Sequence, residues 1–197
     1  LNNKNDDFVV GCKSKFNNLI EIFIKVDNTS GLFFKLTKIL EHSGLEIIDA
    51  NIFTSINKEF AANTFITKFL HHDRPFTQSD LKELSNRIIK NFDKFEKIGK
   101  LKTKSKKSIK FQNILTINES SNKETGKNLV TIETSDRQGL LSEIANVFFK
   151  QNVSILSARI NTLGDRVEDT FEIENFNANI VPNYKMKKIK SALKKVL

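Results

Sequence analysis

The pattern of hydrophobic and polar positions changes its period along the chain in a regular order. Apolar residues fill every second position of Ile20–Val26, which is typical of a strand with one buried face. Between residues 32 and 40 they recur three or four positions apart, which predicts an amphipathic helix that stops at Gly44. Two further strands, Leu45–Ile56 and Phe60–Phe69, are predicted to form a hairpin. A second helix is predicted from the apolar positions Leu81, Leu84, Ile88, Phe92 and Phe95.

The same order of elements returns later, so the sequence contains an internal repeat. When Leu19–Ile66 is written above Leu129–Ile173, alanine and threonine residues coincide at one constant offset, and a Thr-Phe pair follows in both. Strands are predicted at Val153–Leu163 and Arg166–Phe176, and a last helix begins near Pro182, a tolerated first-turn position. Two copies of a unit of about 70 residues follow from this self-similarity.

Strand, helix, strand, strand, helix is the order within each copy, which predicts an α+β fold. Each copy is expected to be a ferredoxin-like module of the βαββαβ type, an antiparallel sheet with both helices on one face. The fourth strand is predicted to come from the N-terminal side, from Phe8–Lys13 and from Ile109–Asn118. The predicted parts are a connector at 1–18, domain 1 at 19–96, a basic linker with an extra strand at 97–126, and domain 2 at 127–197.

Composition and charge indicate the cellular compartment and the kinds of partner to expect. The chain has 197 residues, a formal net charge of +9 and one cysteine, Cys12, which cannot form an internal disulfide. A reducing, cytoplasmic setting and no membrane-spanning helix are expected. The chain begins with Leu1 rather than Met, which suggests a fragment. Excess lysine indicates either a nucleic acid or acidic partner, or only a compositional bias. The lysines of Lys97–Lys110 likewise indicate a solvated linker or a docking segment.

The turn between the first strand and first helix carries the candidate chemistry in both copies. Gly31 and Gly139 stand where the chain turns into a helix, and glycine there permits positive φ and close approach of a ligand. The helix start offers free N–H groups to a carboxylate. Asn28 and Asp136, three residues earlier, can accept hydrogen bonds from an ammonium group, which predicts a pocket for a free α-amino acid. Alternatively, both residues cap their helices.

These motifs resemble a known family. Each copy is similar to an ACT domain, a small regulatory module that binds amino acids at this loop. The resemblance rests on Asn28–Phe33 with Asp49–Thr54, and on Asp136–Leu141 with Ser157–Thr162. The tandem spacing, together with Thr116–Ser121 and Gly164–Phe171, resembles the C-terminal region of bifunctional PII uridylyltransferase/uridylyl-removing enzymes.

The resemblance implies a glutamine-responsive regulatory pair that controls upstream catalytic domains acting on the signalling protein PII. It implies no cofactor in this chain, and Mg²⁺ only for the absent catalytic domains. The ligand-binding residues that it implies are Asn28, Thr29, Ser30, Gly31, Leu32, Asp136, Arg137, Gln138, Gly139 and Leu140. Glu46 and Ser154 stand where the family often carries Asn to meet the ligand from the neighbouring module, and they are candidates for the same contact.

The chain departs from the family's loop pattern Asp-x-Pro-Gly. Ser30 and Gln138 occupy the proline positions, Asn28 replaces the aspartate in the first copy, and Asn63 replaces the usual aspartate before Thr-Phe. The second loop is therefore closer to the family's pattern and is expected to be the better-preserved binding site.

No catalytic centre is expected in this chain, because neither an Asp-x-Asp pair nor a Ser-His-Asp or Cys-His set is visible. His72-Asp73 has the residue types of a metal-binding doublet, but it precedes Pro75 and is expected in a surface loop. Two other functions stay open. One is a ligand-free interaction scaffold joined through strand edges. The other is an RNA-binding module that uses Phe65 or Phe171, residues whose spacing suits the core equally well.

Overall fold

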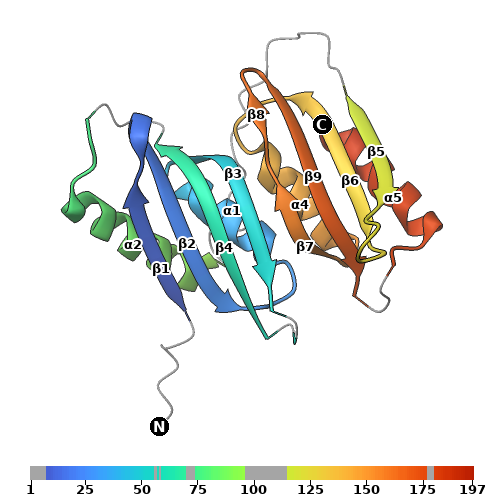
Figure 1. Cartoon of the computed structure of the whole chain (residues 1–197), viewed down its shortest axis with the longest axis horizontal. Helices are drawn as coiled ribbons and strands as arrows, with labels where there is room; N and C mark the ends of the chain where they lie inside the picture. Colours follow the sequence, from blue (N-terminus) through green and yellow to red (C-terminus); the bar gives the residue numbers. More distant parts are fainter. Residues whose placement is uncertain (1–7, 56, 58, 70–73, 96–114, 177–179) are drawn as a thin grey trace. The chain divides into compact units, whose positions relative to one another are not determined.

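The structure is a computed structural model that describes residues 8–55, 57, 59–69, 74–95, 115–176 and 180–197. The chain divides into two compact units, Leu1–Lys102 and Thr103–Leu197. Each unit is an antiparallel sheet with helices on one face, so the predicted α+β fold class is confirmed (Figure 1). The finer domain boundaries stay a prediction, and the Lys97–Lys110 run lies outside the described residues.

Unit 1 holds a four-stranded sheet in the order β1-β2-β4-β3. Alternate residues of β2 point to the helices, where Ile20, Ile22 and Ile24 are fully buried against α1 and α2. Its elements are β1 (Val9–Ser14), a 3₁₀ turn η1 (Phe16–Asn18), β2 (Leu19–Asp27), α1 (Leu32–His42), β3 (Leu45–Thr54), β4 (Phe60–Phe69) and α2 (Gln78–Asp93).

Unit 2 repeats this arrangement with the order β5-β6-β9-β7, and the short β8 pairs with β9. Phe148 of the first helix packs on Phe171 of the sheet, with ring centroids 5.3 Å apart, and both are fully buried. The elements are β5 (Thr116–Ser121), β6 (Asn128–Ser135), α4 (Leu140–Lys150), β7 (Val153–Arg159), β8 (Thr162–Leu163), β9 (Arg166–Asn175) and α5 (Asn183–Val196).

The fourth strand of each sheet comes from the N-terminal side, as the sequence predicted. β1 pairs antiparallel with β2, and β5 pairs antiparallel with β6. Residues 109–114 of the second predicted strand lie outside the described residues. Each unit is therefore a βαββαβ-type sheet in which a preceding strand takes the edge position of the last one.

The two sheets also share an irregularity. The register between the outer strand and its neighbour shifts between Ile47 and Asp49 in β3, and between Ile155 and Ser157 in β7. Such a bulge inserts one unpaired residue and bends the strand. Its return at the same place confirms that the repeat extends to backbone detail.

Helix ends follow local chemistry. Gly44 follows α1 with φ 83°, the left-handed position expected from the sequence, and Asn152 takes the same place after α4 with φ 51°. Pro182 is the N-cap of α5 rather than its first-turn residue, so that helix begins one residue later than predicted.

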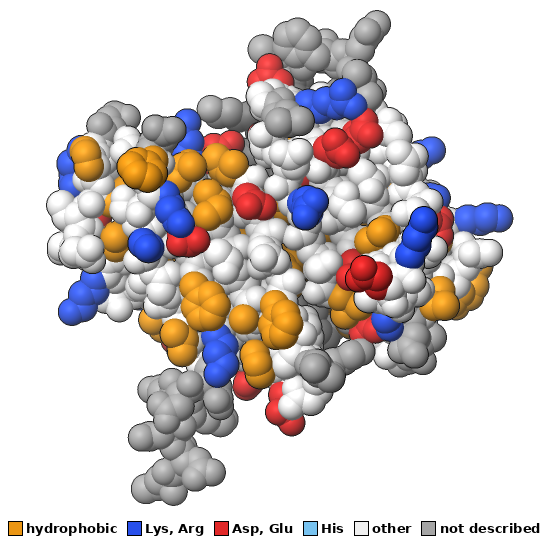
Figure 2. All heavy atoms as spheres, viewed as in Figure 1, with side chains coloured by type: hydrophobic (Ala, Val, Ile, Leu, Met, Phe, Trp, Pro, Cys, Tyr) orange, Lys and Arg blue, Asp and Glu red, His pale blue; other side chains and the backbone are white. Residues whose placement is uncertain are grey.

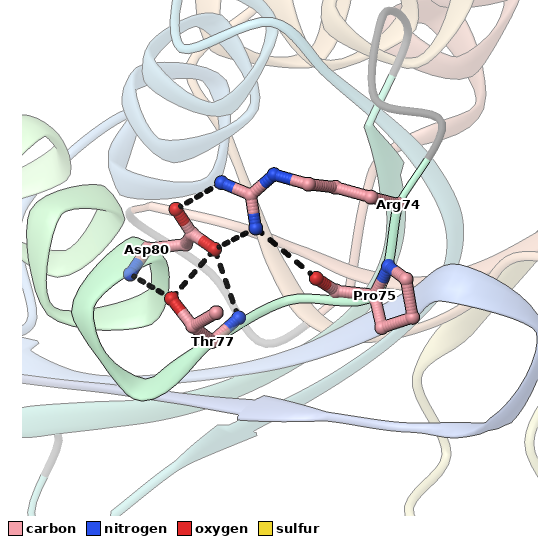
Figure 3. Close-up of polar contacts among 4 residues, drawn as sticks. All are labelled: Arg74, Pro75, Thr77 and Asp80. Atoms are coloured by element: carbon pink, nitrogen blue, oxygen red, sulfur yellow. Dashed lines mark hydrogen bonds and ion pairs between the residues drawn. The ribbon is translucent and has the colours of Figure 1, made fainter.

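A capping box stabilises the N-terminus of α2. Thr77 Oγ1 accepts from the Asp80 N–H at 3.2 Å, and Asp80 Oδ2 accepts from the Thr77 N–H at 2.8 Å (Figure 3). Arg74 binds both Asp80 oxygens, at 2.7 and 2.8 Å. These partners, Arg74 first, hold the pKa of Asp80 well below its usual range.

The strand predicted at Val153–Leu163 is interrupted after Arg159. The Asn161 N–H donates to the Asp169 side chain at 3.3 Å, and the Asn161 carbonyl accepts from the Glu168 N–H at 2.9 Å. A side chain of β9 thus takes the place of a main-chain partner, which breaks the ladder at residues 160–161.

Candidate functional site

The β2–α1 and β6–α4 loops have the same main-chain conformation. The Leu32 N–H donates to the Thr29 carbonyl, and the Leu140 N–H donates to the Arg137 carbonyl, each at 3.1 Å. The glycine before each helix has positive φ, with φ 72°, ψ 15° at Gly31 and φ 85°, ψ −1° in its counterpart. These are the dihedrals of the third residue of a type II turn, which explains the requirement for glycine.

Each loop is also tied to the tip of the neighbouring hairpin. The Asn28 N–H donates to the Glu59 carbonyl, and the Asp136 N–H donates to the Asp165 carbonyl, both at 2.8 Å. The N-cap residues of α1 and α4 are the two glycines, without a side-chain cap. The alternative that Asn28 and Asp136 are the N-cap residues of these helices is therefore wrong.

The structure brings the predicted loop residues together, but it gives them different roles. The side chains of Leu32 and Leu140 are buried in the two cores, so only their main chains can meet a ligand. Thr29, Ser30 and Gln138 are exposed on the outside of the turns. That these residues bind a ligand stays a prediction.

Arg137 links the unit 2 loop to both helices of that unit. Its Nη2 donates to Glu143 Oε2 of α4 at 2.5 Å and to the Val196 carbonyl of α5 at 2.7 Å. Its Nη1 is buried and has no hydrogen-bond partner among the described residues. An unsatisfied buried donor is costly, so this nitrogen is an exception among buried polar groups.

Two carboxyl groups of unit 2 have raised pKa values. Burial raises the pKa of Asp136; the Arg137 main-chain N–H and guanidinium oppose the shift, whereas the charge of Asp165 adds to it. Asp169 is only 1% exposed, and burial raises its pKa to about 7; the Asn161 N–H opposes this shift and the charge of Asp136 adds to it.

Sequence reasoning missed Asp169, Glu143 and Asp165. A signal for Asp169 was present, because it alternates with Val167 and Phe171 on the apolar face of β9. A carboxyl at a core position in a strand indicates either a buried partner or a functional role. Glu143 carries no comparable signal, since its role depends on where Arg137 points.

The equivalent positions of unit 1 carry amides and a hydroxyl. Asn28 and Thr29 stand where unit 2 has Asp136 and Arg137, and Asn63 stands where it has Asp169. Asn63 is 1% exposed, and its Nδ2 donates to the Ile24 carbonyl at 3.5 Å. The first loop therefore offers no formal charge at these positions.

Glu46 and Ser154 lie away from the loop of their own unit. Glu46 pairs in register with Lys68 and Ser154 with Glu174, at the end of the sheet where β3 and β7 begin. The loop lies at the opposite end, where Val26 and Thr54 both pair with Ala61 of β4. Glu46 and Thr54 are eight residues apart on an extended strand, which is about 26 Å at 3.3 Å per residue. Within one unit they cannot join the loop site, and their contact with a ligand of the neighbouring module stays a prediction.

Other candidate sites can be tested against the described residues. They contain no group of three or more His, Cys, Asp or Glu side chains placed to hold a metal ion, and the His72-Asp73 doublet lies outside them. Phe65 and Phe171 are fully buried, so neither can stack on a nucleic acid base. Among the helices described, none is long and apolar enough to cross a membrane.

Comparison with known proteins supports the resemblance to uridylyltransferases. No model of a known protein family matches the sequence. The chain is 27% identical over 179 residues to a bifunctional uridylyltransferase/uridylyl-removing enzyme of Psychrobacter sp. (strain PRwf-1), covering 90% of this chain and 20% of that enzyme. It is 29% identical over 176 residues to the enzyme of Psychrobacter cryohalolentis, covering 88% of this chain and 19% of that enzyme. The chain thus spans about a fifth of these relatives.

Among solved structures, an aspartate kinase from Synechocystis aligns with 91% of this chain and 26% of its own length. The TM-score is 0.46 and the sequence identity 14%.

Proposed function

We propose that this chain, which resembles about a fifth of a uridylyltransferase/uridylyl-removing enzyme, is a tandem ACT-type regulatory segment. In this proposal the unit 2 loop binds a free α-amino acid, with glutamine as the first candidate. Occupancy then controls catalytic domains of the same polypeptide that modify a PII-type signalling protein. The observation that carries the proposal is the β6–α4 loop, which sets an acid and an unsatisfied buried guanidinium nitrogen at one helix start.

The loop groups divide between the two ends of an amino acid. Asp136 receives the ammonium group through a charge-assisted hydrogen bond. The carboxylate meets the first-turn N–H groups of α4, where the helix dipole is positive, together with Arg137 Nη1. Gly139 lets the ligand approach the main chain closely, since it has no side chain.

Modest energies suffice for this function. A sensor that works near millimolar amino acid needs only about −4 kcal/mol of binding free energy. Regulation of the catalytic domains requires a coupling free energy of about 1–3 kcal/mol. A few charge-assisted hydrogen bonds provide energies of this size.

Calorimetric titration of the chain with glutamine, glutamate and other amino acids tests the proposal. Saturable binding of glutamine is expected in the wild type and in Gly31→Val, the matched change in unit 1, and is expected to be lost in Gly139→Val. Circular dichroism checks that both variants fold. Equal loss of binding in both variants contradicts the assignment to unit 2, and no heat with any amino acid contradicts the sensor.

One observation favours a second function, a ligand-free interaction scaffold. The open face of the unit 1 sheet carries Phe23 and Phe53, 40% and 56% exposed, and Lys25 Nζ lies 5.1 Å from the Phe60 ring centroid. Figure 2 shows hydrophobic side chains (orange) over this sheet. Exposed apolar groups on one face are typical of contact surfaces. Binding of a protein partner without any amino acid, lost in Phe53→Ser, supports this alternative.

A further inference from the structure

Asp169 is a buried acid on the helix-facing side of β9. It stands in register with Ile132 of β6 and alternates with the buried Val167 and Phe171. Its Oδ1 accepts one hydrogen bond, from the Asn161 N–H at 3.3 Å. A carboxylate in such surroundings is costly, whereas the protonated acid is tolerated, because a neutral group loses far less hydration.

Unit 1 shows what this position accommodates. Asn63 is equally buried, and its Nδ2 donates to the carbonyl of Ile24, the residue equivalent to Ile132. A protonated aspartic acid resembles asparagine in shape and, like asparagine, presents a hydrogen-bond donor. The backbone at this place is therefore suited to a neutral side chain that donates, and in unit 2 only a bound proton provides one.

The loop supplies the charge that Asp169 responds to. Asp136, in the β6–α4 loop, is the charged group that disfavours ionisation of Asp169. Asp136 is itself influenced by Asp165 from the β8–β9 turn and by Arg137 from its own loop. Between β7 and β8, the Asn161 main chain contacts Asp169 through its N–H. In the first turn of α4 the buried residues are Leu140, Leu141 and Ser142, and all three are uncharged.

We propose that Asp169 is a positioning residue that carries a proton and releases it when a cationic group binds at Asp136. This rests on the proposed function, with the ammonium of an amino acid as the cation. The bound cation compensates the charge of Asp136, which removes the repulsion against an ionised Asp169. The O–H bond of Asp169 breaks, the proton passes to the buffer, and the carboxylate keeps the electron pair.

Two consequences follow from this linkage. Binding at pH 7 releases a fraction of a proton, at most about half for a group half-protonated there. Affinity for glutamine increases with pH up to about 7, at most tenfold per pH unit, and levels off above that value because the free chain no longer carries the proton. A residue with a purely structural role produces neither effect.

The test is calorimetric titration of the whole chain with glutamine at pH 7, in two buffers of different ionisation enthalpy. The wild type is expected to give different apparent enthalpies, and Asp169→Asn the same enthalpy in both. Asn63 in unit 1 is the precedent that this variant folds. Glu168→Gln, the exposed neighbour on the same strand, is the matched control and is expected to behave as the wild type. Buffer-independent binding by the wild type, or unchanged proton release in Asp169→Asn, overturns the proposal.

A second measurement separates this inference from the proposed function. Carboxyl ¹³C chemical shifts follow Asp169 in the free chain from pH 4 to 9, with Asp169→Asn to assign the signal. A midpoint near pH 7 that falls in Asp136→Asn supports the coupled pair even if glutamine does not bind. A midpoint below pH 5 overturns the proposal whatever the ligand.

Discussion

The two strand-to-helix loops share one main-chain conformation but differ in the charge of their side chains. Both hold a glycine with positive φ before the helix, close the same turn and are tied to the neighbouring hairpin tip by a 2.8 Å hydrogen bond. Unit 1 lines the loop with Asn28 and Thr29, whereas unit 2 lines it with Asp136 and Arg137. The conformation therefore depends on the glycine and the turn, and the remaining positions are free to set the charge.

The open faces of the two sheets differ in the same way. Unit 1 exposes Phe23, whereas its equivalent Thr131 in unit 2 shares a 3.1 Å hydrogen bond with Thr170. Where unit 1 has Lys25, unit 2 has Glu133 paired with Arg166. A shared core thus supports an apolar face in one copy and a polar, internally bonded face in the other.

The largest effect is expected from exchanging the buried residues Asp169 and Asn63. The folded-state pKa of Asp169, about 7, lies above the unfolded value near 3.9. The folded chain therefore binds the extra proton between these values, and this stabilisation is complete below about pH 4 and lost as pH rises to 7. We expect the free energy of unfolding of unit 2 to fall by a few kcal/mol over that range, with a slope of at most about 1.4 kcal/mol per pH unit.

Asp169→Asn is expected to abolish this slope and to make unit 2 more stable above pH 7. Asn63→Asp is expected to create the slope in unit 1. Urea denaturation from pH 4 to 8, with hydrogen exchange to tell the units apart, measures both. Parallel curves for wild type and Asp169→Asn contradict the buried acid.

The second effect concerns the ligand. Asp136→Ala is expected to weaken glutamine binding at least tenfold, about 1.4 kcal/mol, because the ammonium loses its charged partner. Asn28→Ala, the matched change in unit 1, is expected to alter affinity less than twofold. Calorimetric titration compares them. Equal losses would mean that both loops bind the amino acid.

A third, smaller difference lies at the starts of the second helices. α2 has the Thr77 capping box, whereas α5 begins after Pro182 without a side-chain cap. Thr77→Ala is expected to lower the free energy of unfolding by about 1 kcal/mol, because the Asp80 N–H loses its acceptor. Thr77→Ser keeps the hydroxyl and is expected to change it little. Urea denaturation distinguishes the variants, and equal stability of Thr77→Ala and wild type argues against the cap.

The smallest effect should be the same in both loops. Ser30 and Gln138 occupy the second position of the turn, where proline has the required φ. Ser30→Pro and Gln138→Pro are each expected to stabilise the chain by about 0.4–1 kcal/mol, because the unfolded chain loses conformational freedom. Thermal unfolding measures the gain. A loss of stability in one loop alone would show that the two turns differ.

Much of the fold and part of the site were predictable from local pattern. Alternation in Ile20–Val26, the glycines of both loops and the internal repeat predicted the elements and the strand-to-helix turn, and the structure confirms them. The strand predicted at Val153–Leu163 was wrong at residues 160–161, because the Asp169 side chain competes for the Asn161 N–H. Hydrophobic periodicity predicts which face of a sheet a side chain occupies. It does not predict that a side chain will replace a main-chain hydrogen-bond partner.

The repeated modules, the order of their elements and the loop that carries Asp136 follow from the sequence, because hydrophobic period, glycine position and self-similarity are properties of the sequence itself. Only the tertiary structure shows that Asp169 is buried and feels the charge of Asp136, and that Arg137 reaches Val196 across 59 positions of the chain. Burial and charge coupling are set by what packing brings together, and neither is encoded in the period of the residues concerned.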